Sequence, residues 1–231
     1  MYPIPTLRRM QRVAAMVELR LGSARQPLRR ILCLGSHCDD IEIGCGGTIL
    51  RWLDEFPNLQ FHWVVFSSTP KRRREASLSA QAFLQKARTK KVVMRNHRDS
   101  FFPSFGRQIK EDFEKLKKFK PDLILTHYRH DLHQDHRLIC ELTWNTFRDH
   151  LILEYEIPKY DGDLGQPNFF VPLGQESYRR KVRYIMDAFE TQRTKRWFEK
   201  ETFLALMRLR GMESNAPSGY AEAFYCRKLV L

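Results

Sequence analysis

The fold is decided by a short stretch that reads ILCLG at residues 31–35 and continues as SHCDDIEIGCGGTIL at 36–50. The first five residues are mostly apolar and predict a buried strand, while the spacing of the apolar residues that follow predicts a helix over 46–56. The three glycines within 44–47 are expected to let the backbone turn tightly from the strand into this helix. They do not have the GxGxxG spacing of dinucleotide-binding enzymes, which disfavours a nucleotide-cofactor enzyme.

The alternation of apolar runs and helical segments continues through the rest of the chain's first two thirds. Further strands are predicted at 59–67, 91–94, 122–126 and 151–157. The intervening helices are predicted at 72–87, 107–119 and 137–149. Strands that alternate with helices in this way form a mostly parallel sheet with helices on both faces. We therefore expect a Rossmann-like, doubly wound α/β fold with the strand order 3-2-1-4-5.

The length of 231 residues suits one well-buried domain. We expect residues 1–28 to form a basic N-terminal extension and residues 158–231 to elaborate the same domain. Within the elaboration, PKYDGDLGQPN at 158–168 predicts a loop because it is rich in proline, glycine and aspartate. The last elements are predicted to be helices at 176–192 and 194–210 and a strand at 220–231.

The chain is basic, with 40 Lys and Arg against 27 Asp and Glu and a net charge of +13. The basic residues are densest at 71–74, 88–91 and 179–183. No nucleic-acid motif accompanies them, so we expect no nucleic-acid partner. A solvated basic surface explains the charge most simply. The alternative is attraction to an acidic partner such as a nucleotide-sugar, a phosphorylated glycan or an anionic membrane surface.

The five cysteines favour a reducing compartment, because they are odd in number and include no CxxC pair. No apolar stretch reaches the length of a transmembrane helix, and the basic N-terminus lacks the apolar core of a signal peptide. A cytoplasmic location is therefore expected. The sequence leaves the oligomeric state open and is compatible with a homo-oligomer.

Two clusters of polar residues follow predicted strands. His37, Asp39 and Asp40 come directly after the first strand, where two adjacent carboxylates would repel each other unless a cation lies nearby. The second cluster, THYRHDLHQDHRL at 126–138, follows the fourth strand and holds half of the eight histidines. Each cluster alone has a structural alternative: a buried imidazole with a helix-capping aspartate, or a solvated histidine-rich loop.

The expected topology brings the two clusters together. The first and fourth strands are neighbours at the switch point of a sheet with this order, and ligands bind at the carboxyl ends of such strands. Imidazole and carboxylate groups that meet there are typical metal ligands. The two clusters together therefore predict a metal site, which neither predicts alone.

At these residues the sequence resembles the PIG-L/LmbE-like deacetylase family. The family signature HPDD followed by GCGGT is similar to HCDDIEIGCGGT at 37–48, and the family's HPDH is similar to HQDH at 133–136. YAEAF at 220–224 resembles its closing motif. Cys38 and Gln134 replace the prolines of the two signatures, and neither departure alters a ligand position.

The resemblance implies a zinc-dependent hydrolase that removes an N-acetyl group from an N-acetylglucosamine-type sugar, nucleotide-sugar or glycoconjugate. By position in the motifs, it implies as metal ligands His37, Asp40 and His136. It further implies that Asp39 is the general base and that a charged His133, steered by Asp135, stabilises the oxyanion or protonates the leaving amine. Two histidines and one carboxylate also suit ferrous iron.

Two further residues resemble substrate-binding positions of the family. Arg72 is the first arginine of an RxxE pattern, although Arg73 and Arg74 make its register ambiguous, and Asp99 follows the third strand. The sequence assigns no role to Asp131, nor to His127 and His130, which we expect to be structural rather than ligating. An amidase for a larger acyl group and a non-enzymatic basic binding module are the alternative functions.

Overall fold

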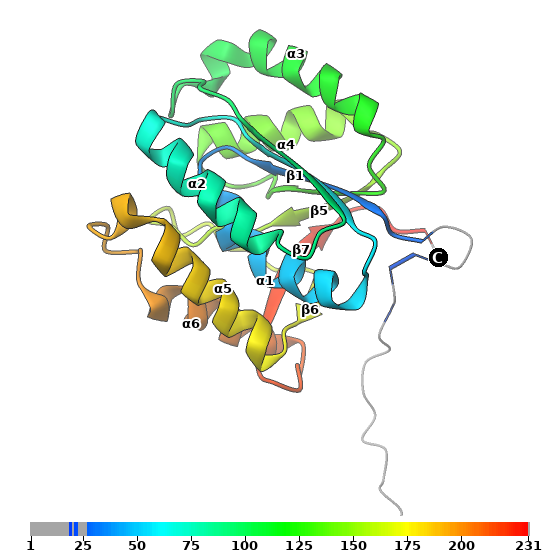
Figure 1. The fold of residues 1–231 in the computed structure, drawn as a ribbon, viewed down its shortest axis with the longest axis vertical. Helices are drawn as coiled ribbons and strands as arrows, with labels where there is room; N and C mark the ends of the chain where they lie inside the picture. Colours follow the sequence, from blue (N-terminus) through cyan, green and yellow to red (C-terminus); the bar gives the residue numbers. More distant parts are fainter. Residues whose placement is uncertain (1–18, 20, 23–26, 231) are drawn as a thin grey trace, which may run out of the picture.

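The computed structural model describes residues 19, 21–22 and 27–230. Its centre is a seven-stranded sheet with the order β3-β2-β1-β4-β5-β7-β6 (Figure 1). The strands are β1 (Arg30–Gly35), β2 (Gln60–Val65), β3 (Thr89–Met94), β4 (Leu123–His127), β5 (Leu151–Tyr155), β6 (Phe169–Pro172) and β7 (Ala221–Cys226). The first five strands are parallel, and β7 runs antiparallel to both of its neighbours. The expected order 3-2-1-4-5 is confirmed.

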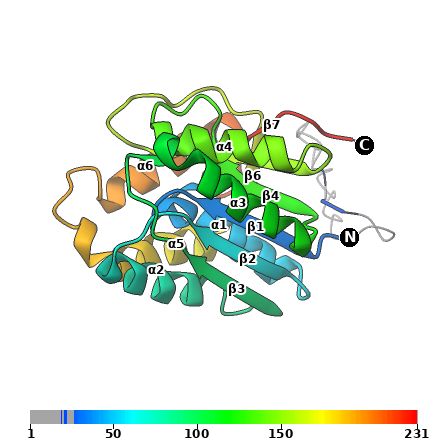
Figure 2. The ribbon, with the colours of Figure 1, turned by 90° about the horizontal axis from the view of Figure 1, so that it is seen from above.

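Helices cover both faces of the sheet, as the alternating pattern predicts (Figures 1 and 2). One face carries α1 (Asp40–Glu55), α2 (Pro70–Phe83), α5 (Gln175–Ala188) and α6 (Lys200–Glu213), and the other carries α3 (Gly106–Leu116) and α4 (Gln134–Thr146). Short 3-10 turns lie at Phe102–Phe105, Lys117–Phe119 and Glu190–Gln192, the last of which is η3. A separate hydrophobic core fills each interface between sheet and helices.

The C-terminal part differs in detail from the prediction. Strand β6 lies just beyond the predicted loop and was not expected, because four residues that end in proline give too short a pattern to recognise. The predicted helix 176–192 ends four residues early, at Ala188. Most of the predicted extension 1–28 lies outside the described residues. In the described part of the chain, no helix is both long and apolar enough to cross a membrane.

The prediction for the glycine-rich segment was wrong. Helix α1 begins at Asp40, six residues before the predicted start, so the glycines lie inside the helix rather than in a turn. Their positions are explained by close packing, because an added Cβ at Gly44 would lie 2.2 Å from the ring of Tyr155. At Gly46 the same atom would lie 2.5 Å from Phe83. The glycines therefore let α1 approach β5 and α2 closely, with its first residue at the carboxyl edge of the sheet.

A buried ion pair also contacts the middle of α1. Glu222, the central residue of the YAEAF segment in β7, accepts hydrogen bonds from the backbone N–H groups of Gly47 (2.9 Å) and Thr48 (2.6 Å). Lys181 of α5 donates to the same carboxylate and to the carbonyl of Ile43, each at 2.6 Å. The closing segment of the chain therefore holds the helix that carries the first polar cluster.

Candidate metal centre

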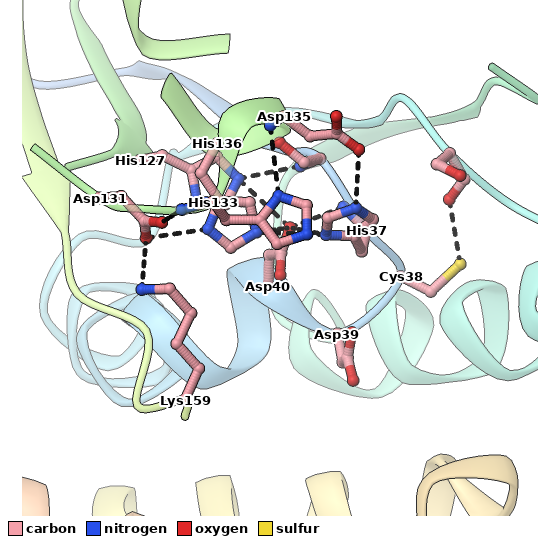
Figure 3. Close-up of polar contacts among 12 residues, drawn as sticks. His37, Cys38, Asp39, Asp40, His127, Asp131, His133, Asp135, His136 and Lys159 are labelled. Carbon is pink, nitrogen blue, oxygen red and sulfur yellow. Dashed lines mark hydrogen bonds and ion pairs between the residues drawn. The ribbon is translucent and has the colours of Figure 1, made fainter. Parts of the chain in front are cut away.

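Three side chains from the two clusters meet at the carboxyl edge of β1 and β4 (Figure 3). His37 follows β1, Asp40 opens α1, and His136 lies in the first turn of α4. His37 Nδ1 lies 3.2 Å from His136 Nε2 and 3.5 Å from Asp40 Oδ2, and the last two atoms are 3.6 Å apart. Ligands about 2.0–2.1 Å from a tetrahedral zinc ion would be about 3.3–3.4 Å apart. The three atoms therefore have the spacing of one face of such a site.

The outer nitrogen of each histidine faces a carboxylate. His37 Nε2 lies 3.1 Å from Asp99 Oδ1 and 3.3 Å from Asp135 Oδ2. His136 Nδ1 lies 2.9 Å from Asp131 Oδ2. Histidines that bind metals usually donate their second N–H group to such a partner, which fixes the ring and increases its basicity. Both rings are therefore oriented with their inner nitrogens directed at a shared point.

The charges of the cluster also suit a cation. Burial and the neighbouring His127 lower the pKa of His136 to about 4, so this ring is neutral near pH 7 and its Nε2 can act as a ligand. Burial opposes ionisation of Asp40, but the surrounding histidines outweigh it and hold its pKa well below the usual range. His37 shows the opposite change: burial lowers its pKa, but Asp40, Asp135 and Asp99 raise it well above the ordinary value. The carboxylates thus favour positive charge at this position.

Three other groups of donor atoms overlap with this set. They are His37, His133 and His136; His37, Asp99, His133 and Asp135; and Asp40, His127 and His136. His127 is fully buried beneath the cluster, stacks on His136 with ring centroids 3.9 Å apart, and accepts a hydrogen bond at Nε2 from the backbone N–H of Ser36. His130 is exposed and packs against Tyr128. The structure therefore brings six of the predicted site residues into one cluster: His37, Asp40, Asp99, His133, Asp135 and His136.

The structure corrects the expected relation between His133 and Asp135. The Asp135 carboxylate does not face His133; it accepts hydrogen bonds from the backbone N–H groups of Ser100 (2.7 Å) and Phe102 (3.1 Å) and approaches His37. The backbone N–H of Asp135 instead donates to His133 Nδ1 at 3.2 Å. Burial and the nearby His37 lower the pKa of His133, which favours a neutral ring over the expected charged one. Because Nδ1 accepts the N–H of Asp135, the proton of the neutral ring lies on Nε2.

Asp39 lies apart from the other members of the first cluster (Figure 3). Its Oδ1 accepts a hydrogen bond of 2.8 Å from Arg72 of α2, so Arg72 contacts the carboxylate that the motif assigns as base. Burial raises the pKa of Asp39, Arg72 opposes the shift, and Asp40 adds to it. Arg73 instead donates to Ser68 Oγ at 3.3 Å. Among the arginines at 72–74, Arg72 is therefore the one that reaches the site.

The loop at 158–168 contributes a residue that the sequence did not indicate. Lys159 Nζ lies 3.0 Å from Asp131 Oδ2, the oxygen that faces His136, and also pairs with Asp163 (Figure 3). Asp131 Oδ1 accepts from the backbone N–H of His133 at 2.8 Å. Asp131, which had no predicted role, therefore links both histidines of HQDH to this loop. The DxHxDH spacing could have indicated Asp131, but no local pattern indicates Lys159.

The thiol of Cys38 is turned away from the cluster. It points to the backbone carbonyl of Ser67 at 3.4 Å, and the residue is 2% exposed (Figure 3). Burial raises the pKa of this thiol to about 12, and nearby carboxylates add to the shift against the opposing effect of Arg72. Cys38 therefore fills the proline position of the signature as a protonated, buried side chain.

The fold is shared with solved structures of low sequence identity. N,N'-diacetylchitobiose deacetylase from Pyrococcus horikoshii is 20% identical with a TM-score of 0.68, and the match covers 86% of this chain and 83% of that one. The A40926 pseudoaglycone deacetylase Dbv21 is 16% identical with a TM-score of 0.64, over 87% and 97% of the two chains. GalB, the 4-carboxy-2-hydroxymuconate hydratase from Pseudomonas putida KT2440, is 15% identical with a TM-score of 0.72, over 88% and 98%.

A sequence comparison identifies the family directly. The family described as PIG-L, GlcNAc-PI de-N-acetylase, matches residues 32–147, which is half of the chain. The match begins in β1, ends after α4, and contains all of the polar clusters at the carboxyl edge of the sheet. The chain belongs to the PIG-L family.

Proposed function

We propose that this protein is a zinc-dependent hydrolase that removes an N-acetyl group from an N-acetylglucosamine-type sugar or sugar conjugate. The observation that carries the proposal is the set of His37 Nδ1, Asp40 Oδ2 and His136 Nε2, with mutual distances of 3.2–3.6 Å and carboxylates behind both rings. Three protein ligands leave a position open for water or substrate, as in catalytic zinc sites. Ferrous iron fits the same ligands.

The reacting groups follow from the positions of the side chains around this set. When bound, the zinc ion would polarise the amide carbonyl and lower the pKa of water toward about 7. His133 accepts the backbone N–H of Asp135 at Nδ1, which leaves Nε2–H to donate a hydrogen bond to the developing oxyanion. Asp39 accepts a proton from the attacking water and passes it to the leaving nitrogen, and its raised pKa suits both steps.

The ion pair between Arg72 and Asp39 links substrate binding to the release of the general base. A sugar hydroxyl or phosphate that binds Arg72 would compete with Asp39 for the guanidinium and free the carboxylate to turn toward the cluster. The Asp99 side chain is 66% exposed at the outer edge of the cluster and contacts His37 Nε2, so we assign it to substrate binding as well. The family description and the names of two solved structures, both deacetylases, support an acetylated sugar or glycoconjugate as the substrate class.

The experiment combines metal analysis with acetate release. Purified protein is expected to hold about one zinc ion per chain and to release acetate from N-acetylglucosamine conjugates. Asp39→Asn is expected to retain the metal and lose about 10²–10⁴-fold in turnover, the range for a general base. Asp149→Asn, which removes a carboxylate that is 91% exposed and pairs with His150, is the matched control and should retain full activity.

Three results would contradict the proposal. Wild-type protein that binds no divalent metal would remove its basis, and an Asp39→Asn variant as fast as wild type would show that the base is another group. Faster release of a longer acyl group than of acetate would favour the amidase alternative.

The cellular location is a further part of this proposal. All five cysteines are free thiols, which supports an enzyme of the cytoplasm.

A further inference from the structure

Helices α5 and α6 belong to the helical layer on the α1 side of the sheet (Figure 1). Residues of these two helices line a groove. Its volume is about 720 Å³, within the range of about 300–1,000 Å³ that is usual for small-molecule sites. It is lined by Tyr178, Arg179, Val182, Arg183, Met186, Asp187, Arg193, Lys200, Leu204 and Tyr220. None of these residues belongs to the metal centre. The residues from α5 span 178–187, which corresponds to a length of about 14 Å along the helix.

The groove has an apolar and aromatic part. Val182 is buried, and Met186 and Leu204 are partly exposed. Tyr178 and Tyr220 stack on each other at one end, with ring centroids 4.1 Å apart and an angle of 22° between the rings. An apolar surface with tyrosine rings binds hydrocarbon or ring portions of a ligand, and the phenol groups can donate hydrogen bonds.

The remaining lining residues are mostly cationic. Arg179, Arg183, Arg193 and Lys200 are all exposed, whereas Asp187 is the single carboxylate in the lining. Over residues 27–230, none of the four cations forms an ion pair with a carboxylate. At one end of the groove, Arg193 donates a hydrogen bond of 3.1 Å to the backbone carbonyl of Met186. Three guanidinium groups and an ammonium group around one groove favour a multivalent anion, because arginine binds phosphate through paired N–H groups.

We propose that this groove binds a small amphiphile that carries a phosphate group on an apolar or ring portion. The charges disfavour two other occupants of the groove, because a second copy of the chain carries a net charge of +13 and the segment 1–28 is also basic. The volume of the open groove matches a small molecule, and the apolar part distinguishes the site from one for free phosphate. Arg179 and Arg183, two of the basic residues in the run 179–183, thereby gain a function beyond solvation.

The groove is separate from the metal centre but is connected to it through η3. Arg193 directly follows η3, whose Thr191 donates through its backbone N–H (2.9 Å) and its hydroxyl (2.5 Å) to Glu75. Glu75 in turn lies 3.9 Å from Arg72, the partner of Asp39. A ligand at the Arg193 end of the groove therefore lies close to the segment that supports the edge of the active site.

The test is calorimetric binding of dodecyl phosphate below its micelle concentration, with inorganic phosphate and dodecyl maltoside as comparison ligands. Dodecyl phosphate is expected to bind wild-type protein with one site per chain and more tightly than either comparison ligand. The double variant Arg179→Glu/Arg183→Glu should bind it at least about tenfold more weakly, because two cations are replaced by anions. Both residues are exposed on α5, so the variant is expected to fold.

The control is Lys91→Glu/Lys118→Glu, which makes the same change in net charge at two exposed residues outside the groove. It should bind dodecyl phosphate as wild type does. Equal binding by the groove variant and wild type would overturn the proposal, as would equal binding of dodecyl maltoside or of inorganic phosphate. Binding to anionic vesicles without binding of the monomeric amphiphile would also overturn it and indicate a membrane-docking surface. Metal content of the groove variant should be unchanged, which keeps this result separate from the metal-centre proposal.

Discussion

The buried pair of Lys181 and Glu222 gives a sharp test of how the closing segment holds α1. Each side chain is 3% exposed, and their charged atoms are 2.6 Å apart. Glu222→Leu keeps a similar volume but leaves the ammonium group buried without a counter-charge. Breaking such a pair from one side lowers stability by about 3–5 kcal/mol. For a chain of this size, that corresponds to a decrease in Tm of about 6–20 °C.

The double variant Lys181→Met/Glu222→Leu distinguishes the effect of breaking the ion pair from the effect of replacing the two side chains. It removes both charges, and it frees the carbonyl of Ile43 to accept from the N–H of Gly47, four residues later in α1. Replacement of a buried ion pair by apolar residues is often close to neutral. We therefore expect the double variant to recover about 2–3 kcal/mol of the loss in the single variant.

The assay is equilibrium unfolding in urea, followed by circular dichroism, for wild type, both single variants and the double variant. A loss of less than about 1 kcal/mol for Glu222→Leu would refute the reasoning, because it would show that the ammonium group reaches water. A double variant less stable than either single variant would refute it too, since the charges would then not be compensating each other.

Three further predictions concern the centre and the packing of α1. Asp131→Asn should lower zinc affinity about 10–100-fold in a chelator competition, since the ring of a ligand loses its carboxylate partner; unchanged affinity would contradict this. Gly44→Ala should cost about 1–3 kcal/mol by thermal unfolding, because its Cβ would lie 2.2 Å from an aromatic ring, whereas Gly106→Ala, with no atom within 4 Å, should not destabilise. Iodoacetamide at pH 8 should modify partly exposed Cys226 in the native protein and spare Cys38, whose pKa of about 12 leaves about one thiolate in 10⁴; early labelling of Cys38 would contradict that.

The features that the sequence predicted correctly follow from the order of strands and helices along the chain. Alternating strands and helices predicted the order β3-β2-β1-β4-β5, because a parallel sheet leaves few ways to connect such elements. The same topology predicted that the segments after β1 and β4 meet at one edge, where the structure brings His37, Asp40 and His136 together.

Features that depend on contacts between distant segments could not be read from local patterns. Lys159 approaches Asp131 from a loop whose composition predicts only a connection between elements. The Asp135 carboxylate accepts from backbone N–H groups after β3 rather than facing His133. The glycines of α1 resembled a turn, because a local pattern cannot show that the ring of Tyr155 lies against Gly44. Asp39 was recognised by its motif, but its contact with Arg72 required the structure.

Metal content of single variants is the measurement that tests the central claim most directly, because three other donor sets overlap with the proposed one. After purification and dialysis with zinc, we expect wild type, His133→Asn and His127→Asn to hold about one ion per chain. His37→Ala, Asp40→Asn and His136→Ala should each lose it. Retention by His37→Ala together with loss by His127→Asn would contradict this account and identify Asp40, His127 and His136 as the ligands.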